Sequence, residues 1–210
     1  MSYERLTSEN AALLLIDHQT GLSNGVQDQS VPEYITSVTA LVKLAKAFRL
    51  PTVVTTSAAD RQNGPLLPVI TQTLPDAPVI HRPGEINAWE NKDFVEAVKK
   101  TGRKKLLVAG VSTEVCVTFV ALSAIKEGFD VYAVIDASGT WNKLVQEVAV
   151  ARMAQAGAKP ITWVAVGAEL QGDWRSATGP QLASIMGEHL PYYGNLISSF
   201  NAAKGQTKAA

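Results

Sequence analysis

The strongest constraint on the fold of this chain is a set of short apolar runs that alternate with longer helical patterns. The clearest run is Ala11–Ile16, and two others are Leu106–Ala109 and Val131–Ile135. A continuous apolar run of this length predicts a strand that is covered on both faces, as in a parallel sheet. Thr52–Thr56 is rich in β-branched residues and predicts a further strand.

Helical patterns fill the spaces between these strands. Apolar residues recur at helical spacing after Pro32, and Asn91 is the expected N-cap of a later helix. Further strands are expected at Val79–Ile80 and at Pro160–Thr162, which leads into the stretch Trp163–Leu170. Further helices are expected at Glu114–Glu127, Lys143–Ala156 and Gln181–Leu190. This alternation predicts an α/β fold of three layers: a Rossmann-like, mostly parallel sheet of about six strands with helices on both faces.

Length and charge narrow the possible classes of protein. A chain of 210 residues favours one domain, 1–210, and the polar segment Asn201–Ala210 predicts a flexible tail. Lys+Arg and Asp+Glu both number 19, so the formal net charge is zero. The charge balance therefore gives no reason to expect binding to nucleic acid or to an anionic membrane. No apolar run approaches the roughly 20 residues of a membrane helix.

The cysteine count bears on the compartment. Cys116 is the one cysteine, so no disulfide can form within the chain, and Met1–Asn10 lacks the pattern of a signal peptide. Both observations favour a reducing, cytoplasmic location.

Three predicted strands are followed by reactive side chains. Asp17 ends the first strand, Arg82 follows the third, and Cys116 lies just after the fourth, near the start of a helix. The carboxyl ends of parallel strands form the usual ligand site of such sheets. A thiol with a carboxylate and a cation nearby suits nucleophilic catalysis. The helix start and Arg82 lead us to expect a lowered pKa for Cys116.

Each residue also has a simpler interpretation. A lone cysteine is more often a small buried apolar residue than a nucleophile, and an aspartate at a strand end is often a turn former. The three histidines, His18, His81 and His189, lack the close spacing of metal ligands. The residues alone therefore leave catalysis open.

Three segments together resemble the motif blocks of a known family. They are LLLIDHQTG from Leu13 to Gly21, HRPGEINAW from His81 to Trp89, and AGVSTEVCV from Ala109 to Val117. In order and spacing they resemble the isochorismatase-like cysteine hydrolase superfamily, and most closely its YcaC-type branch. The resemblance continues through VIDASGTWN, Val134 to Asn142, and reaches Trp174.

The resemblance implies a catalytic triad of Asp17, Arg82 and Cys116. It also implies a cis peptide between Val111 and Ser112, and an oxyanion hole made by the backbone N–H groups of Ser112 and Cys116. Many family amidases have lysine where this chain has Arg82. Because arginine stays charged, it can orient Asp17 but cannot carry protons.

Further expectations follow from the same resemblance. Asn87, Trp89 and Trp141 are expected to line or cover a substrate pocket. Nicotinamidase-like relatives bind a metal through an aspartate and histidines after the second strand. The matching stretch here, 57–64, contains Asp60 but no histidine, so we expect neither a metal nor a cofactor.

The expected partners are a small-molecule substrate and further copies of the chain. Members of the YcaC-type branch look like octamers, so we expect a homo-oligomer, possibly an octamer. The apolar stretch Trp163–Leu170 and the aromatic residues Trp174, Tyr192 and Tyr193 could supply its contacts or could equally cover the core.

The favoured function is hydrolysis of a C–N bond in a small amide-like substrate through a Cys116 thioester. An alternative is a non-catalytic or stress-related binding protein that retains the hydrolase scaffold. Isochorismatase-type vinyl-ether hydrolysis is disfavoured, because that branch lacks the nucleophilic cysteine. A nucleotide-binding oxidoreductase is disfavoured because 17–25 has no G-x-G-x-x-G motif.

Overall fold

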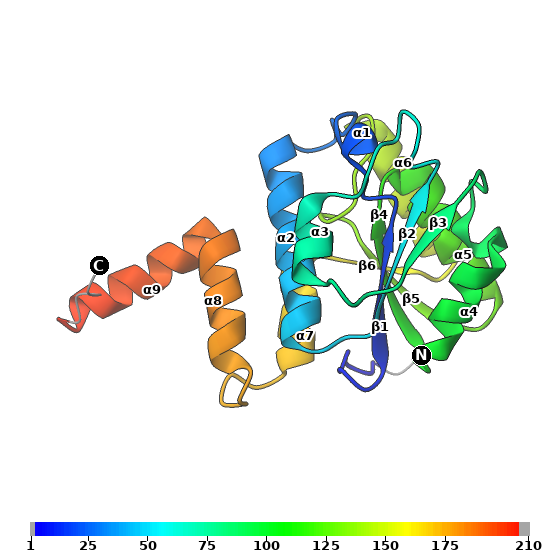
Figure 1. Cartoon of the computed structure of the whole chain (residues 1–210). Helices are drawn as coiled ribbons and strands as arrows, with labels where there is room; N and C mark the ends of the chain where they lie inside the picture. The colour runs from blue at the N-terminus through cyan, green and yellow to red at the C-terminus, as the bar shows by residue number, and fades with distance from the viewer. Residues whose placement is uncertain (1–2, 206–210) are drawn as a thin grey trace.

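The chain folds around one parallel sheet. A computed structural model describes residues 3–205, and its six strands all pair in parallel, in the order β3-β2-β1-β4-β5-β6 (Figure 1). The strands are β1 (Ala11–Ile16), β2 (Thr52–Ser57), β3 (Val79–Arg82), β4 (Lys105–Gly110), β5 (Asp130–Val134) and β6 (Lys159–Ile161). The predicted α/β fold with six parallel strands is confirmed.

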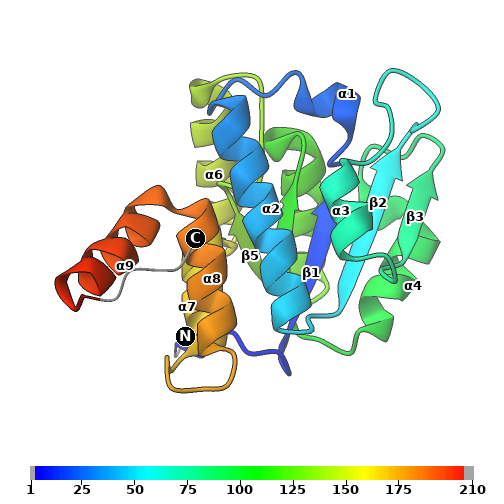
Figure 2. The same cartoon turned by 60° about the vertical axis from the view of Figure 1, so that its left-hand side comes forward.

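Helices cover both faces of the sheet. They are α1 (Thr20–Ser23), α2 (Val31–Ala47), α3 (Pro68–Thr73), η1 (Ala88–Glu90), α4 (Lys92–Lys100), η2 (Thr113–Val117), α5 (Thr118–Lys126), α6 (Lys143–Gln155), α7 (Trp163–Gln171), α8 (Gly179–His189) and α9 (Pro191–Ala203). Helices α2, α3, α7 and α8 lie on one side, and α4, α5 and α6 lie on the other (Figures 1 and 2).

The composition of strand β1 explains why helices must pack on both faces of the sheet. All six of its residues are fully buried. Alternate residues face opposite sides of a strand, so Leu13 and Leu15 join the core beneath α2, whereas Leu14 and Ile16 join the core beneath α5. The apolar run of β1 is therefore satisfied only when helices pack on both faces.

The winding of the sheet reverses between β1 and β4, which are neighbours although far apart in sequence. Ile16 pairs with Gly110 at their carboxyl ends. A side chain at Gly110 would collide with the backbone oxygen of Ile16 at 2.2 Å, so only glycine fits this close approach. Such a reversal opens a crevice beyond the strand ends, where ligands bind in α/β sheets.

The structure refines several predicted boundaries. The helix expected from Glu114 begins as the π-helical turn η2 and becomes α-helical only at Thr118. The stretch 163–170 forms α7, and its apolar residues pack in the core.

The end of the chain differs from the prediction more strongly. Helix α9 was not predicted; it extends to Ala203, into the segment expected to be a flexible tail. The rest of that predicted tail includes 206–210, which lie outside the described residues. Across 3–205, no helix has the length and apolar character needed to cross a membrane.

Candidate active site

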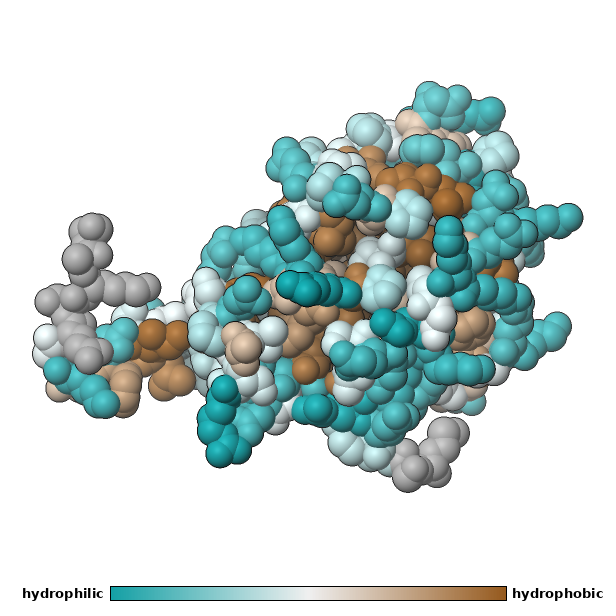
Figure 3. Space-filling view, turned by 60° about the horizontal axis from the view of Figure 1, so that its bottom comes forward, coloured by the Kyte–Doolittle hydropathy of each residue, from teal (hydrophilic) through white to brown (hydrophobic). Residues whose placement is uncertain are grey.

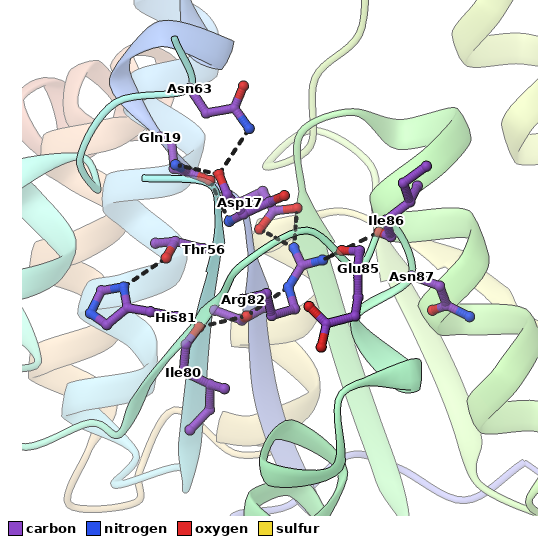
Figure 4. Close-up of polar contacts among 12 residues, drawn as sticks. Asp17, Gln19, Thr56, Asn63, Ile80, His81, Arg82, Glu85, Ile86 and Asn87 are labelled. Carbon is purple, nitrogen blue, oxygen red and sulfur yellow. Dashed lines mark hydrogen bonds and ion pairs between the residues drawn. The ribbon is translucent and has the colours of Figure 1, made fainter. Parts of the chain in front are cut away.

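Asp17 and Arg82 form a buried ion pair at the carboxyl edge of the sheet. Asp17 directly follows β1 and has a left-handed backbone conformation, with φ of 56°, which aspartate adopts more readily than most residues. Arg82 is the last residue of β3, two strands away. Its Nη2 donates to both carboxylate oxygens of Asp17, and both side chains are almost wholly shielded from solvent (Figure 4).

The remaining nitrogens of Arg82 are also bonded. Nε donates to Thr55 Oγ1 at 3.0 Å, and Nη1 donates to the backbone oxygens of Glu85 and Ile86. Thr55 in turn donates to the Ile80 oxygen at 2.8 Å. These bonds hold the guanidinium in one orientation, so its permanent charge is directed at Asp17. Sequence reasoning missed Thr55, because a threonine in a strand gives no signal beyond its β propensity.

Cys116 lies on the turn η2, between β4 and α5; it lines the same cavity as Asp17, whose carboxylate is near enough to influence the pKa of its thiol. The backbone between β4 and this turn contains the predicted cis peptide, Val111–Ser112. The N–H of Ser112 interacts with the Cys116 sulfur. The three predicted catalytic residues are therefore brought together from three separate strand exits.

The protonation of Cys116 differs from the sequence-based expectation. Burial, followed by the negative charge and hydrogen bond of Asp17, raises the pKa of the Cys116 thiol, and Arg82 lowers it only weakly. The predicted lowering of this pKa was wrong because burial disfavours the charged thiolate, and because Arg82 donates to Asp17 and not to the sulfur. Burial also raises the pKa of Asp17, against the opposing effect of Arg82. The resting site is a neutral thiol beside a carboxylate.

A cavity of about 240 Å³ opens above these groups. It is lined by Asp17, Leu22, Ser57, Asn63, Ile86, Val111, Ser112, Glu114, Val115, Cys116 and Trp141. Larger hollows lie at the opposite, amino edge of the sheet, and none of those is lined by a predicted catalytic residue. The reactive groups therefore face a compartment that fits only a small molecule.

Of the three predicted pocket residues, only Trp141 lines this cavity. The Asn87 amide donates to Ser123 Oγ at 3.0 Å, and the Trp89 indole donates to Glu127 Oε1 at 2.8 Å. Trp89 also packs edge-on against Phe129. The prediction is therefore corrected for Asn87 and Trp89, which join α5 to the η1 turn and lie away from the cavity within one chain.

A network around Gln19 shapes the cavity wall. The Gln19 side chain accepts from the backbone N–H of Ser57 and donates to the oxygens of Ser57 and Gly64, while Asn63 donates to Ser57 oxygen (Figure 4). These bonds fix the loop after β2 against the exit of β1. Gln19 belongs to the first motif block, but its positioning role was not predicted.

The loop that carries the metal ligands in nicotinamidase-like relatives has a different composition here. Asp60 is exposed on this loop. Within the part of the chain that the structure describes, no three histidine, cysteine or acidic side chains are grouped to hold a metal ion. Metal independence remains a prediction.

Comparison with known proteins agrees with this geometry. The family described as the isochorismatase domain matches residues 11–165, which include all three of these catalytic candidates. The chain belongs to the isochorismatase family. A probable hydrolase, YcaC of Escherichia coli, is 50% identical over 97% of this chain and 98% of its own length.

Two solved structures of YcaC proteins are similar throughout. The Escherichia coli structure has a TM-score of 0.93 and 52% identity, covers 97% of this chain and 99% of its own, and is described as an octameric hydrolase of unknown specificity. The Pseudomonas aeruginosa structure has a TM-score of 0.92 and 52% identity, covers 96% and 99%, and carries hexane-2,5-diol and covalent acrylamide. This family member is accordingly a hydrolase, and the likeness leaves its substrate open.

Proposed function

We propose that this isochorismatase-family chain hydrolyses the C–N bond of a small amide, with Cys116 as nucleophile. The observation that carries the proposal is the contact of the Cys116 thiol with the buried Asp17–Arg82 pair at a small cavity. A thiol needs a base to become a potent nucleophile, and Asp17 lines the same cavity and acts on the pKa of the thiol.

In the first step, Asp17 accepts the thiol proton while the sulfur attacks the carbonyl carbon of the substrate. The raised pKa of Asp17 makes it a stronger base than an exposed carboxylate. Arg82 stays charged and keeps the carboxylate oriented. Because the resting thiol is neutral, the proton moves as the S–C bond forms, and no stable thiolate is needed.

The carbonyl oxygen becomes an oxyanion, for which the N–H groups of Ser112 and Cys116 are the proposed donors. One such donor typically contributes about 3 kcal/mol to transition-state stabilisation. The C–N bond then breaks, and the amine leaves with the proton held by Asp17. Water, deprotonated by Asp17, cleaves the thioester, releases the carboxylic acid and restores the thiol.

A covalent adduct in a related structure supports the proposal that Cys116 is an accessible nucleophile. The Pseudomonas aeruginosa YcaC structure contains covalent acrylamide, a small electrophilic amide. This chain has one cysteine, and it lines a cavity whose volume suits a molecule of that size. We also propose a cytoplasmic location, because a reducing compartment keeps this thiol free.

Intact-mass spectrometry tests the proposal. The wild-type protein should gain the mass of one acrylamide, and it should form a transient acyl adduct with hydrolysable members of a panel of small amides. Cys116→Ser should form neither adduct, whereas the control Ser8→Ala, at a half-buried position outside the cavity lining, should behave as wild type. An acyl adduct that accumulates, with no more than one amine released per chain, would favour the alternative, a binding protein that retains the scaffold.

We further propose that the chain assembles with copies of itself, since the Escherichia coli relative is octameric. Helix α9 extends away from the body and has no buried residue (Figures 1 and 3). Its large apolar residues Tyr192, Leu196 and Phe200 recur every four positions and are more than half exposed. Such a one-sided apolar stripe is typical of an interface. Light scattering near the 22.4 kDa of one chain would contradict assembly.

A further inference from the structure

The charges that line the cavity do not balance. Asp17 and Glu114 are its two ionisable acids, and no lysine or arginine is among its lining residues. The charge of Asp17 is compensated from behind by Arg82. Within residues 3–205, Glu114 forms no ion pair. A small molecule that enters this cavity therefore meets one uncompensated carboxylate.

The Glu114 carboxylate is held in place by a neutral hydrogen bond. Thr140 Oγ1 donates to Glu114 Oε2 at 2.6 Å. No described residue donates to the other oxygen, Oε1, so it is available to a ligand. Thr140 itself is fully buried, and its N–H donates to Asp28 Oδ1 at 2.9 Å. The residue that holds the Glu114 carboxylate in place, Thr140, thus belongs to the interior of the protein.

The nearby acid Asp28 has partners of its own. Gln146 donates to Asp28 Oδ2 at 2.7 Å, and Lys143 exerts an attractive charge on Asp28. Lys143 is bonded to the Gln146 side chain at 2.6 Å. Lys143, the cation in this region, therefore compensates the charge of Asp28. The carboxylate of Glu114 remains as the charge at the cavity wall.

An aromatic ring lines the same cavity as this carboxylate. Trp141 follows Thr140 directly and lines the same cavity. A methyl group on Gly25 would lie 2.5 Å from the Trp141 ring, so the ring packs against bare backbone there. A carboxylate beside an indole is a combination that attracts cations, by charge and by cation–π interaction.

We infer that Glu114, with Trp141, selects substrates that carry a small cationic group, such as an ammonium or amidinium, and disfavours carboxylate-bearing substrates. The inference rests on the proposed function, because it names the class of amide that would reach Cys116. Glu114 would bind the cationic group while the amide carbonyl lies at the sulfur. Glu114 is a specificity residue in this arrangement and takes no part in bond breaking.

Charged thiol reagents test the inference without requiring hydrolysis. Methanethiosulfonates transfer their thioalkyl group to a thiol and release methanesulfinate. Cys116 should react faster with the trimethylammonium-ethyl reagent than with the sulfonato-ethyl reagent, each rate being divided by that for free cysteine. In Glu114→Gln, which keeps the acceptor for Thr140, this preference should fall by about tenfold at low ionic strength. The exposed control Glu147→Gln should retain it.

A preference that is the same in wild type and Glu114→Gln would overturn the inference, even if amides are hydrolysed. If Cys116 reacts with no reagent, the proposed nucleophile fails, and a second measurement decides the inference. Acetamidinium chloride should then raise the Tm of wild type more than that of Glu114→Gln, with sodium chloride as the ionic-strength control. Equal shifts in Tm would contradict the role of Glu114.

Discussion

The carboxyl edge of the sheet and the C-terminal helix α9 differ in how far their side chains are buried and bonded. At the edge, Asp17 and Arg82 are buried, and every nitrogen of the guanidinium has a partner. Helix α9 buries no side chain and presents an apolar stripe to solvent. A buried charged site depends on each of its partners, whereas an exposed helix contributes little to the fold of its own chain. Changes in the two regions should therefore have very different effects on stability.

Removal of the cation from the edge should have the largest effect. Arg82→Met leaves the carboxylate of Asp17 buried without its partner, which should lower the free energy of unfolding by about 3–5 kcal/mol. Urea denaturation at pH 7.5 measures this loss. The matched control is Arg175→Met, which breaks the exposed Arg175–Asp173 pair and should leave the free energy of unfolding nearly unchanged. Equal losses in the two variants would remove the contrast between buried and exposed charges.

His18, the neighbour of Asp17 in sequence, should make the body of the protein sensitive to acid. It is fully buried against Tyr34, and burial lowers its pKa from 6.5 to about 4. The unfolded chain binds this proton below about pH 6.5 and the folded chain only below about pH 4. The free energy of unfolding should therefore fall by about 3 kcal/mol as the pH falls from 6.5 to 4, with no further loss below.

The test compares the pH dependence of unfolding in His18→Phe with that of wild type. Such a comparison is needed because burial raises the pKa of Asp136 to about 6, which has the opposite effect between pH 4 and 6. His18→Phe should remove the His18 part of the slope, and His81→Phe, at an exposed position, should not. The prediction fails if wild type and His18→Phe keep the same slope.

Replacement of Asp17 should make Cys116 more reactive toward a simple reagent while it abolishes hydrolysis. In Asp17→Asn the negative charge that raises the pKa of the thiol is gone, and Arg82 keeps its bonds to Thr55, Glu85 and Ile86. The rate of alkylation by iodoacetamide at pH 7 should rise about tenfold, equivalent to about 1.4 kcal/mol. A slower reaction than in wild type would contradict the inference that the charge of Asp17 raises the pKa of the thiol.

Changes on α9 should affect the fold of the single chain least. The double change Leu196→Ser and Phe200→Ser removes two exposed apolar side chains and opens no cavity. The circular dichroism spectrum should stay that of wild type, whereas the mass from light scattering should fall toward that of one chain. The control Ser198→Ala, on the same helix, should leave the mass unchanged. If the double variant unfolds, α9 is part of the folding core and the contrast between the two regions is wrong.

The elements that local pattern could identify were predicted well. Ala11–Ile16 is a wholly apolar run, and a run of that kind has few stable arrangements other than a strand covered on both faces. The motif blocks identified Asp17, Arg82 and Cys116, because topology brings the exits of parallel strands to one edge. Helix α9 was not predicted, although Tyr192, Leu196 and Phe200 recur at helical spacing.

The sequence by itself determined the sheet, its two helical layers and the identity of the residues that meet at the edge. Only the tertiary structure decided how those residues interact: burial and the charge of Asp17 raise the pKa of the Cys116 thiol, and Arg82 bonds to Asp17 and not to the sulfur. It also decided that Trp141 faces the cavity whereas Asn87 and Trp89 pack elsewhere, and that Glu114 has no ion-pair partner among residues 3–205. The physical reason is that periodicity reports which face of an element is buried, whereas pKa values and pocket walls depend on side-chain distances between segments remote in sequence.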